Sequence, residues 1–211
     1  MDTERPLRLD AERNRDAILS AATAAFAAHG SAASLDDIAR SAKVGVATLY
    51  RRFPTRELLV QAVFDQKVRA YADAMDAAAE RARTEPWLAF HDQVMVILEQ
   101  QATDIAFAEI LAAPLTGSDQ FRAEHRRAFR SMLTLIERAK AAGAVRVDFH
   151  HSDIYLLTLA TAGITRVTAT IAPGAWRRHA AYMLESFRAP GSDAGALPAV
   201  SASWRRLTER Q

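Results

Sequence analysis

Apolar side chains recur every three or four residues over most of this chain, which is the spacing of amphipathic α-helices. In the first such run Ile18, Ala22 and Phe26 share one helical face, and the pattern predicts a helix over about residues 11–28. Gly30 follows this run and suits the left-handed conformation that ends many helices. Alternating apolar runs joined by Asn-Gly or Asp-Gly, the pattern of a β-hairpin, do not occur. The sequence therefore predicts an all-α fold.

Two short helices are predicted next, with a tight turn between them. Ser34 carries a hydroxyl that can cap a helix N-terminus, and an apolar face follows over Leu35–Ala42. Residues 43–45 form the predicted turn, and a third helix covers about 46–52. Pro54 ends that helix, because the residue before a proline is disfavoured in the α region.

A long fourth helix and five further helices complete the nine-helix prediction. Thr55 is the expected cap of a helix over about 55–82, which is roughly 40 Å long at a rise of about 1.5 Å per residue. The remaining runs predict helices through Trp87–Leu98, through Phe107–Leu111, through Phe129–Ile136, from Ser152 or Asp153 to about Thr170, and over Trp176–Phe187. We expect a flexible arm (1–10), a helix-turn-helix domain (11–56), a second helical domain (57–188) and a flexible tail (189–211).

Composition narrows the function classes. The net charge of +2 is small, so a nucleic-acid-binding surface has to be local. The chain has no cysteine, which excludes disulfides, thiolate metal sites and cysteine nucleophiles. The charged start is unlike a secretory signal, and no apolar run approaches the roughly 20 residues that span a bilayer. We expect a cytoplasmic protein without membrane contact and without a cofactor.

The two short helices have the outline of a helix-turn-helix, and their charge supports that interpretation. Five basic residues and no acidic one occur between positions 40 and 56, namely Arg40, Lys43, Arg51, Arg52 and Arg56. DNA phosphates are the partner that such a stretch favours, and a solvated helix face is the alternative. With Leu49 and Phe53 facing the core, Tyr50 points outward and suits a phosphate contact; a packed tyrosine is the alternative.

The stretch from Ser34 to Leu59, SLDDIARSAKVGVATLYRRFPTRELL, resembles the DNA-binding signature of the TetR family of bacterial regulators. The residues that match the family pattern directly are Ala42, Val44, Thr48, Leu49, Tyr50, Phe53, Pro54 and Glu57. The departures are Gly45 in place of a serine cap, Ala47 and Lys43 where glycine is common, Arg52 in place of histidine or tyrosine, and Arg56 in place of lysine.

The resemblance implies which residues contact DNA. It makes Thr48, Tyr50 and Arg56 the expected phosphate contacts. A recognition helix enters the major groove by its N-terminus, which favours Val46, Ala47 and Arg51 for base edges. The full expected set is Ser34, Lys43, Gly45, Val46, Ala47, Thr48, Tyr50, Arg51, Arg52, Thr55 and Arg56.

The resemblance also implies a pocket for a small-molecule effector in the second domain. The candidate lining residues are Phe64, Met75, Phe90, His91, Val94, Phe107, Ile110, Leu111, Phe129 and Met132, with Gln100, Thr103, His125 and Thr134 as further polar candidates. Ordinary core packing is the alternative for each apolar residue, and a surface position for each polar one.

The last two predicted helices have the composition of an interface. Ala160 and Gly163 are small and allow another helix to approach, and helix nine has a broad aromatic face. The expected interface residues are Ile154, Leu157, Ala160, Thr161, Ile164, Thr168, Trp176, His179, Tyr182 and Met183. Two such helices from each subunit would make a four-helix homodimer that matches a roughly palindromic double-stranded operator. Packing within one chain is the alternative.

Together these features predict a ligand-responsive DNA-binding transcriptional regulator, with repression implied by the family resemblance. A helical ligand-binding or interaction dimer without DNA binding is the alternative. His150, His151 and Asp153 raise the idea of a metal site, but Asp153 is better explained as a helix cap. No phosphate loop, nucleophile elbow or zinc-protease motif occurs, so an enzyme is not expected.

Overall fold

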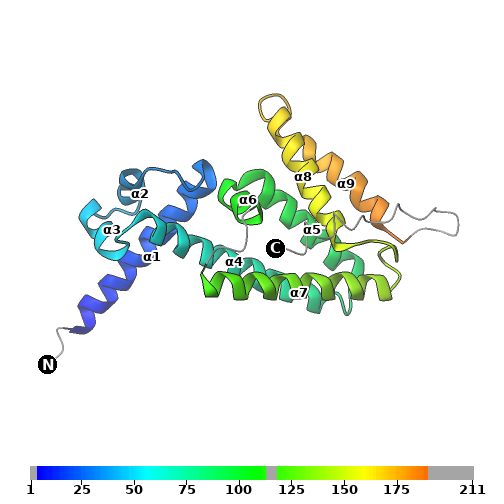
Figure 1. Cartoon of the computed structure of the whole chain (residues 1–211), viewed down its shortest axis with the longest axis horizontal. Helices are drawn as coiled ribbons and strands as arrows, with labels where there is room; N and C mark the ends of the chain where they lie inside the picture. Colours follow the sequence, from blue (N-terminus) through cyan, green and yellow to red (C-terminus); the bar gives the residue numbers. More distant parts are fainter. Residues whose placement is uncertain (1–3, 113–117, 190–211) are drawn as a thin grey trace. The chain divides into compact units, whose positions relative to one another are not determined.

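A computed structural model describes residues 4–112 and 118–189 of the chain, and Figure 1 shows their helices in sequence order. Within those ranges there are nine helices and no strand, which confirms the all-α prediction. Their bounds are α1 Glu4–His29, α2 Leu35–Ser41, α3 Val46–Arg52, α4 Arg56–Arg81, α5 Pro86–Thr103, α6 Ile105–Ala112, α7 Asp119–Ala141, α8 His151–Thr168 and α9 Ala175–Phe187.

The helices form two compact units, and the chain passes between them more than once. The first unit contains the residues up to Lys67 together with Thr103–Leu111, and the second contains Val68–Ala102 and the residues from Ala112 on. The short helix α6 therefore belongs to the first unit, although α5 and α7, on either side of it in the sequence, belong to the second.

The first unit has its own hydrophobic core. Ile18 and Phe26 of α1, Ile38 of α2 and Leu49 of α3 are each completely buried in it. Ala106 of α6 is buried in the same cluster. Asp104 caps α6 by accepting a hydrogen bond from the backbone N–H of Phe107 (2.9 Å), and its other carboxylate oxygen accepts from the Lys67 ammonium. Both side chains of this ion pair are largely buried.

The second unit is held together by polar links between α4 and α7 and by aromatic packing. Arg127 of α7 pairs with Asp73 and Asp76 of α4, and the Arg138 guanidinium donates to the backbone carbonyl of Ala79. Phe149 contacts Phe90 and Phe187 edge to face, with ring centroids 5.3 and 4.9 Å apart. These contacts connect α5, the loop before α8 and the end of α9.

Three features differ from the sequence-based expectations. The helix α1 begins at Glu4, so residues 4–10 of the expected flexible arm are helical; the rest of that arm, and the expected tail from residue 190 on, lie outside the described residues. His150, rather than Ser152 or Asp153, is the N-cap of α8, and Asp153 accepts from the His150 backbone N–H at 2.8 Å. A short antiparallel bridge pairs Val145 with Arg188.

Candidate nucleic-acid interface

The turn between α2 and α3 has the geometry that the sequence predicts. The Ser34 hydroxyl accepts a hydrogen bond from the Asp37 backbone N–H at 3.3 Å and so caps α2. The chain reverses through Lys43, which has a φ of 57° in the left-handed region, and the Val44 N–H then bonds to the Ala39 carbonyl at 3.0 Å. A lysine in this conformation is uncommon, because its Cβ crowds the backbone where glycine has none.

One face of α3 is presented to solvent. Leu49 is completely buried, and Phe53 directly after the helix is nearly so, which fixes the rotation of the helix on the core. Tyr50 is 47% exposed, so the outward orientation predicted for it is confirmed. Gly45, Val46, Ala47, Arg51 and Arg52 are exposed as well, and Thr48 is half-buried.

The cations beside this face are largely unneutralised. Among the described residues, no carboxylate oxygen lies within 4.0 Å of a side-chain nitrogen of Lys43, Arg51 or Arg52. Arg40 differs, because it pairs with Asp37 at 2.6 Å. The Arg51 guanidinium is 3.5 Å from the Thr48 hydroxyl, which places a cation and a hydroxyl together on the exposed face. This arrangement leaves positive charge available to an external polyanion.

The start of α4 is capped beside the same surface. The Thr55 hydroxyl accepts from the Leu58 backbone N–H at 3.3 Å. Hydrogen bonds from its own backbone N–H and from the Thr55 side chain hold the pKa of Glu57 below its usual value. Glu57 therefore stays ionised near the positive end of the helix dipole and stabilises the helix start.

Arg56 has a structural role that the sequence did not reveal. Its Nη1 donates hydrogen bonds to the carbonyl oxygens of Ser31 and Ala33, at 3.1 and 2.7 Å. The guanidinium therefore ties the loop between α1 and α2 to the start of α4, and the side chain is half-buried. The phosphate contact expected of Arg56 has to come from its remaining N–H groups.

Arg15, unlike Arg56, is a residue that sequence patterns did not single out. Its guanidinium carbon lies 5.9 Å from the centroid of the Phe53 ring, within the range of a cation–π contact. It brings a further cation from α1 to the end of α3. The sequence marked Phe53 as a core aromatic residue, but it gave no sign that Arg15, distant in the chain, contacts its ring.

The expected effector-pocket residues fall into both units. Phe64 packs against the core of the first unit, and Phe107 is buried and belongs to the same unit. Met75, Phe90 and Val94 are buried in the second unit. Phe129 and Met132 are half-buried there, and the side chains of Ile110 and Leu111 lie outside the described residues.

The polar pocket candidates differ in how far they are buried. His91 bonds to the neighbouring Asp92 at 3.0 Å near the surface, and the exposed Thr134 hydroxyl donates to its own helix. Thr103 is also exposed, and Gln100 is half-buried. His125 stacks on Phe121, with ring centroids 6.1 Å apart, and burial lowers its pKa.

Four expected interface residues are buried within the protomer itself. Ile154, Leu157, Thr161 and Trp176 are between 0 and 6% exposed, so they pack inside the second unit. Ile164, Thr168, His179 and Met183 are half-buried, while Ala160 and Tyr182 are exposed. The exposed large apolar residues of α8 and the turn after it are ones that the prediction passed over, namely Leu156, Leu159, Val167 and Ile171.

Two further expectations concern membranes and metals. None of the described helices is long and apolar enough to cross a membrane. Within the described residues, no group of three or more histidine, aspartate or glutamate side chains is arranged to hold a metal ion. His150 and Asp153 instead form a capping box at the start of α8.

Comparison with known proteins agrees with this geometry. Residues 18–63 match the model of the bacterial regulatory proteins of the tetR family. Among solved structures, a TetR transcriptional regulator from Streptomyces coelicolor is similar over 84% of this chain and 99% of its own, with 29% identity and a TM-score of 0.61. A TetR regulator from Mycobacterium vanbaalenii is similar over 87% of this chain and 99% of its own, with 28% identity and a TM-score of 0.58.

A third structure, the hemolysin II transcriptional regulator HlyIIR, shares the fold at 18% identity. It covers 84% of this chain and 98% of its own, with a TM-score of 0.57. No curated protein matches the chain.

Proposed function

We propose that this chain, a member of the TetR family by its N-terminal domain and its fold, is a ligand-responsive repressor that binds a specific operator as a homodimer. DNA-binding regulation is the function that this family carries. The finer parts of the proposal are the operator contacts, the small-molecule effector, the pairing of two subunits and the direction of regulation.

The exposed face of α3 is the observation that carries the DNA-binding part. Tyr50 and Val46 stand out from a helix that is fixed by buried Leu49, and Arg51 and Arg52 flank them without a described carboxylate partner. A helix of this kind can enter the major groove, where arginine reads guanine and small apolar groups contact the thymine methyl. Phosphate contacts from Lys43 and Thr48 would set its register.

Buried polar atoms in the second unit support the effector part. Gln93 is 7% exposed and Thr161 is completely buried, yet the Gln93 amide nitrogen and the Thr161 hydroxyl lack a hydrogen-bond partner among the described atoms. Leaving buried polar groups unpaired is costly, and a bound molecule with its own donors and acceptors would satisfy them. Phe90 and Val94, which are buried on the same helix as Gln93, favour an effector that is otherwise hydrophobic.

The outer face of α8 and α9 supports the dimer. Leu156, Leu159, Val167 and Ile171 are 48–84% exposed on α8 and the turn that follows it. Large apolar residues gathered on one face are typical of a protein interface. A two-fold dimer would present two α3 helices to the two halves of a palindromic operator.

The proposed release mechanism is a change in the tilt of α4. This helix runs without interruption from Arg56 to Arg81; Thr55 caps its start, and Arg56 lies in its first turn. An effector that prefers one tilt would move the two recognition helices apart and lower operator affinity. Its effect is limited to the difference between its affinities for the two states.

Fluorescence anisotropy tests the DNA-binding part. Purified protein is titrated against the DNA upstream of its own gene and against random DNA over a salt series. We expect tight, salt-sensitive binding that prefers the upstream DNA. Arg51→Ala should weaken that preference, and Tyr50→Phe should weaken binding to all DNA by a similar factor. Arg83→Gln, which removes an exposed charge from the second unit, is the matched control. Absence of binding at low salt would overturn the proposal.

A further inference from the structure

The threonines of α8 divide into two kinds. Thr158 and Thr168 donate their hydroxyls to backbone carbonyls of their own helix, at 2.7 and 2.8 Å. The hydroxyls of Thr161 and Thr165 are buried and have no hydrogen-bond partner among the described atoms. A threonine inside a helix can usually bond to the preceding turn. Its absence at two positions four residues apart leaves two hydroxyls in need of a partner on one side of α8.

Two glutamines of α5 have buried polar atoms of the same kind. The Nε2 of Gln93 and the Oε1 of Gln100 are buried without a partner in the described part of the chain. The two residues are seven positions apart on one helical face, which separates them by about 10 Å. Ile97 lies between them on that face and is buried. This face of α5 therefore has a polar group at each end and an apolar centre.

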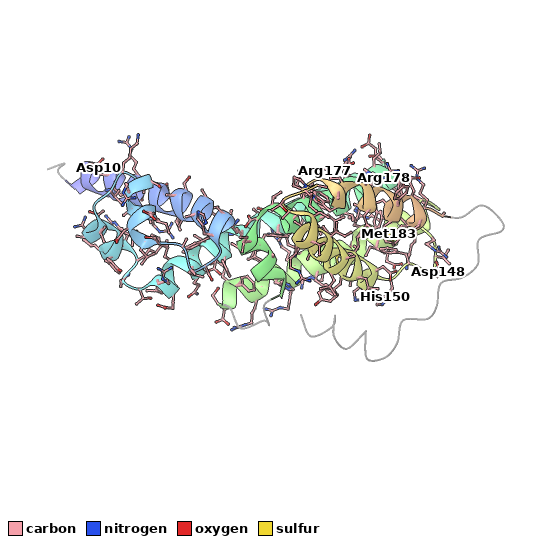
Figure 2. All side chains as sticks on the ribbon, turned by 90° about the horizontal axis from the view of Figure 1, so that it is seen from above. Asp10, Asp148, His150, Arg177, Arg178 and Met183 are labelled. Atoms are coloured by element: carbon pink, nitrogen blue, oxygen red, sulfur yellow. The ribbon has the colours of Figure 1, made fainter. Side chains whose placement is uncertain are left out.

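Two contacts show how α5 lies beside α8 in the second unit. Near the start of α5, the ring of Phe90 is 5.3 Å from the ring of Phe149, which lies just before α8. Near its end, Glu99 pairs at 2.5 Å with Arg177 in the first turn of α9, and α9 packs along α8. Figure 2 labels Arg177 and also His150, the N-cap of α8. The two helices therefore run in the same direction.

Gln100 and Thr161 lie at similar heights along this pair of helices. Counted from Phe90 and from His151, each is ten residues further on, or roughly 15 Å. Thr165 follows one turn later on α8. The three residues therefore gather their unpaired oxygens toward one end of the pair. The Gln93 amide lies two turns away, toward the other end.

The charged residues of α5 and α8 are exposed or already have a partner. Asp92 pairs with Arg81 at 2.8 Å, Glu99 has the partner given above, and Arg166 is exposed. Asp153 accepts a hydrogen bond at the start of α8. An ionised group placed between the two helices would be buried without an opposite charge, which costs far more than burying a hydroxyl. The interior therefore favours an uncharged molecule.

We infer that the effector is an uncharged, mostly apolar molecule with a hydroxyl at one end and a second oxygen about 10 Å away. The hydroxyl donates to Gln100 Oε1 and accepts from Thr161, because only a group that both donates and accepts satisfies both. The second oxygen accepts from Gln93 Nε2, and the apolar body covers Ile97. The inference rests on the effector of the proposed function and names its chemical class.

A set of biphenyl compounds tests this class. The probe has a para hydroxyl on each ring, so a rigid apolar body holds an oxygen at each end. One analogue has a methyl in place of one hydroxyl, and another has a carboxylate in place of each. A straight-chain alkanediol of the same length is a flexible second probe. We expect calorimetry to show binding of the two diols, binding at least about tenfold weaker for the methyl analogue, and none for the dicarboxylate.

Thr161→Val and Thr158→Val form a matched pair of variants. Both remove one hydroxyl from the same face of α8, but only the Thr158 hydroxyl has a bond to lose. Thr161→Val should weaken binding of the dihydroxy probe at least about tenfold and raise the melting temperature of the free protein, since it removes an unpaired buried hydroxyl. Thr158→Val should leave the affinity unchanged and should not raise the melting temperature.

The outcomes separate this inference from the proposed function. If neither diol binds, if the dicarboxylate binds as well as they do, or if the two variants behave alike, the inference is wrong. If the dicarboxylate alone binds and releases operator DNA in the anisotropy assay, the inference fails while the ligand response stands. If the diols bind with the expected dependence on Thr161 but do not release operator DNA, the site is supported and the ligand response fails.

Discussion

Replacing Lys43 by glycine should lower the affinity of the helix-turn-helix for DNA without lowering its stability. Lys43 has a φ of 57°, and its exposed side chain has no described carboxylate partner. A left-handed conformation costs an L residue roughly 1–2 kcal/mol, and glycine avoids that cost. Glycine also gives the unfolded chain more freedom, which lowers stability by about 0.4–1 kcal/mol. Lys43→Gly should therefore leave the free energy of unfolding unchanged or raise it by up to about 1.5 kcal/mol.

The same change should weaken DNA binding if Lys43 contacts a phosphate. Each neutralised phosphate adds about 0.9 to the slope of log K against log salt. Between 1 M and 0.1 M salt that slope corresponds to about an eightfold gain in affinity per contact, or about sixtyfold for the two contacts of a dimer. We therefore expect Lys43→Gly to lower operator affinity by about this factor at 0.1 M salt and to reduce the slope by about 1.8.

Two measurements and two controls complete the test. Urea unfolding followed by circular dichroism reports the free energy of unfolding, and anisotropy over a salt series reports the DNA contacts. Lys43→Asn keeps a residue that tolerates the left-handed conformation and should reproduce the loss of affinity. Lys140→Gln removes a cation from α7 and should leave the salt slope unchanged. A clear loss of stability in Lys43→Gly would refute the strain argument, and an unchanged slope would refute the phosphate contact.

Three further predictions concern other parts of the structure. Arg56→Ala removes two charge-assisted hydrogen bonds to the carbonyls of Ser31 and Ala33 and should destabilise the first unit by about 2 kcal/mol in urea unfolding; an unchanged midpoint would show that these bonds contribute nothing. Gly45→Ser adds a capping hydroxyl at a position where a Cβ meets nothing within 4 Å, so the unfolding midpoint should rise by the equivalent of a few tenths of a kcal/mol, and a fall would contradict the open geometry. Burial lowers the pKa of His125 below its usual 6.5, so the unfolded state takes up its proton first, and the free energy of unfolding should fall as the pH drops below about 6.5; His125→Gln should lessen this dependence in a pH series of melts, and equal curves for both proteins would refute it.

The helices of the first unit were predictable because their boundaries depend on local chemistry. Ser34 caps α2 and Thr55 caps α4 through hydrogen bonds that span three residues, and α3 has the bounds that the sequence predicts, 46–52. The outward orientation of Tyr50 follows from the buried Leu49 beside it. The DNA-binding part of the site is therefore largely contained in one short segment.

Features that depend on distant partners were not predictable. The hydrogen bonds of Arg56 join residues 23 and 25 positions apart, and no local pattern marks a backbone carbonyl as an acceptor. Periodicity identified the apolar stripe of Leu157 and Thr161 but could not tell packing within one chain from packing between two. For the same reason the sequence could not assign α6 to the first unit, since that depends on the burial of Ala106 in the same core as distant residues of α1 to α4.

The placement of α6 limits which segments of this chain recombination can exchange. A recombination event that moved only the N-terminal segment of this chain would leave behind Ala106, which completes its hydrophobic core, and Asp104, the ion-pair partner of Lys67. The family match over residues 18–63 covers neither of them. A chimera that keeps the core of the first unit intact would therefore have to carry α6 as well, and substitutions in α6 and in the first unit are expected to change together.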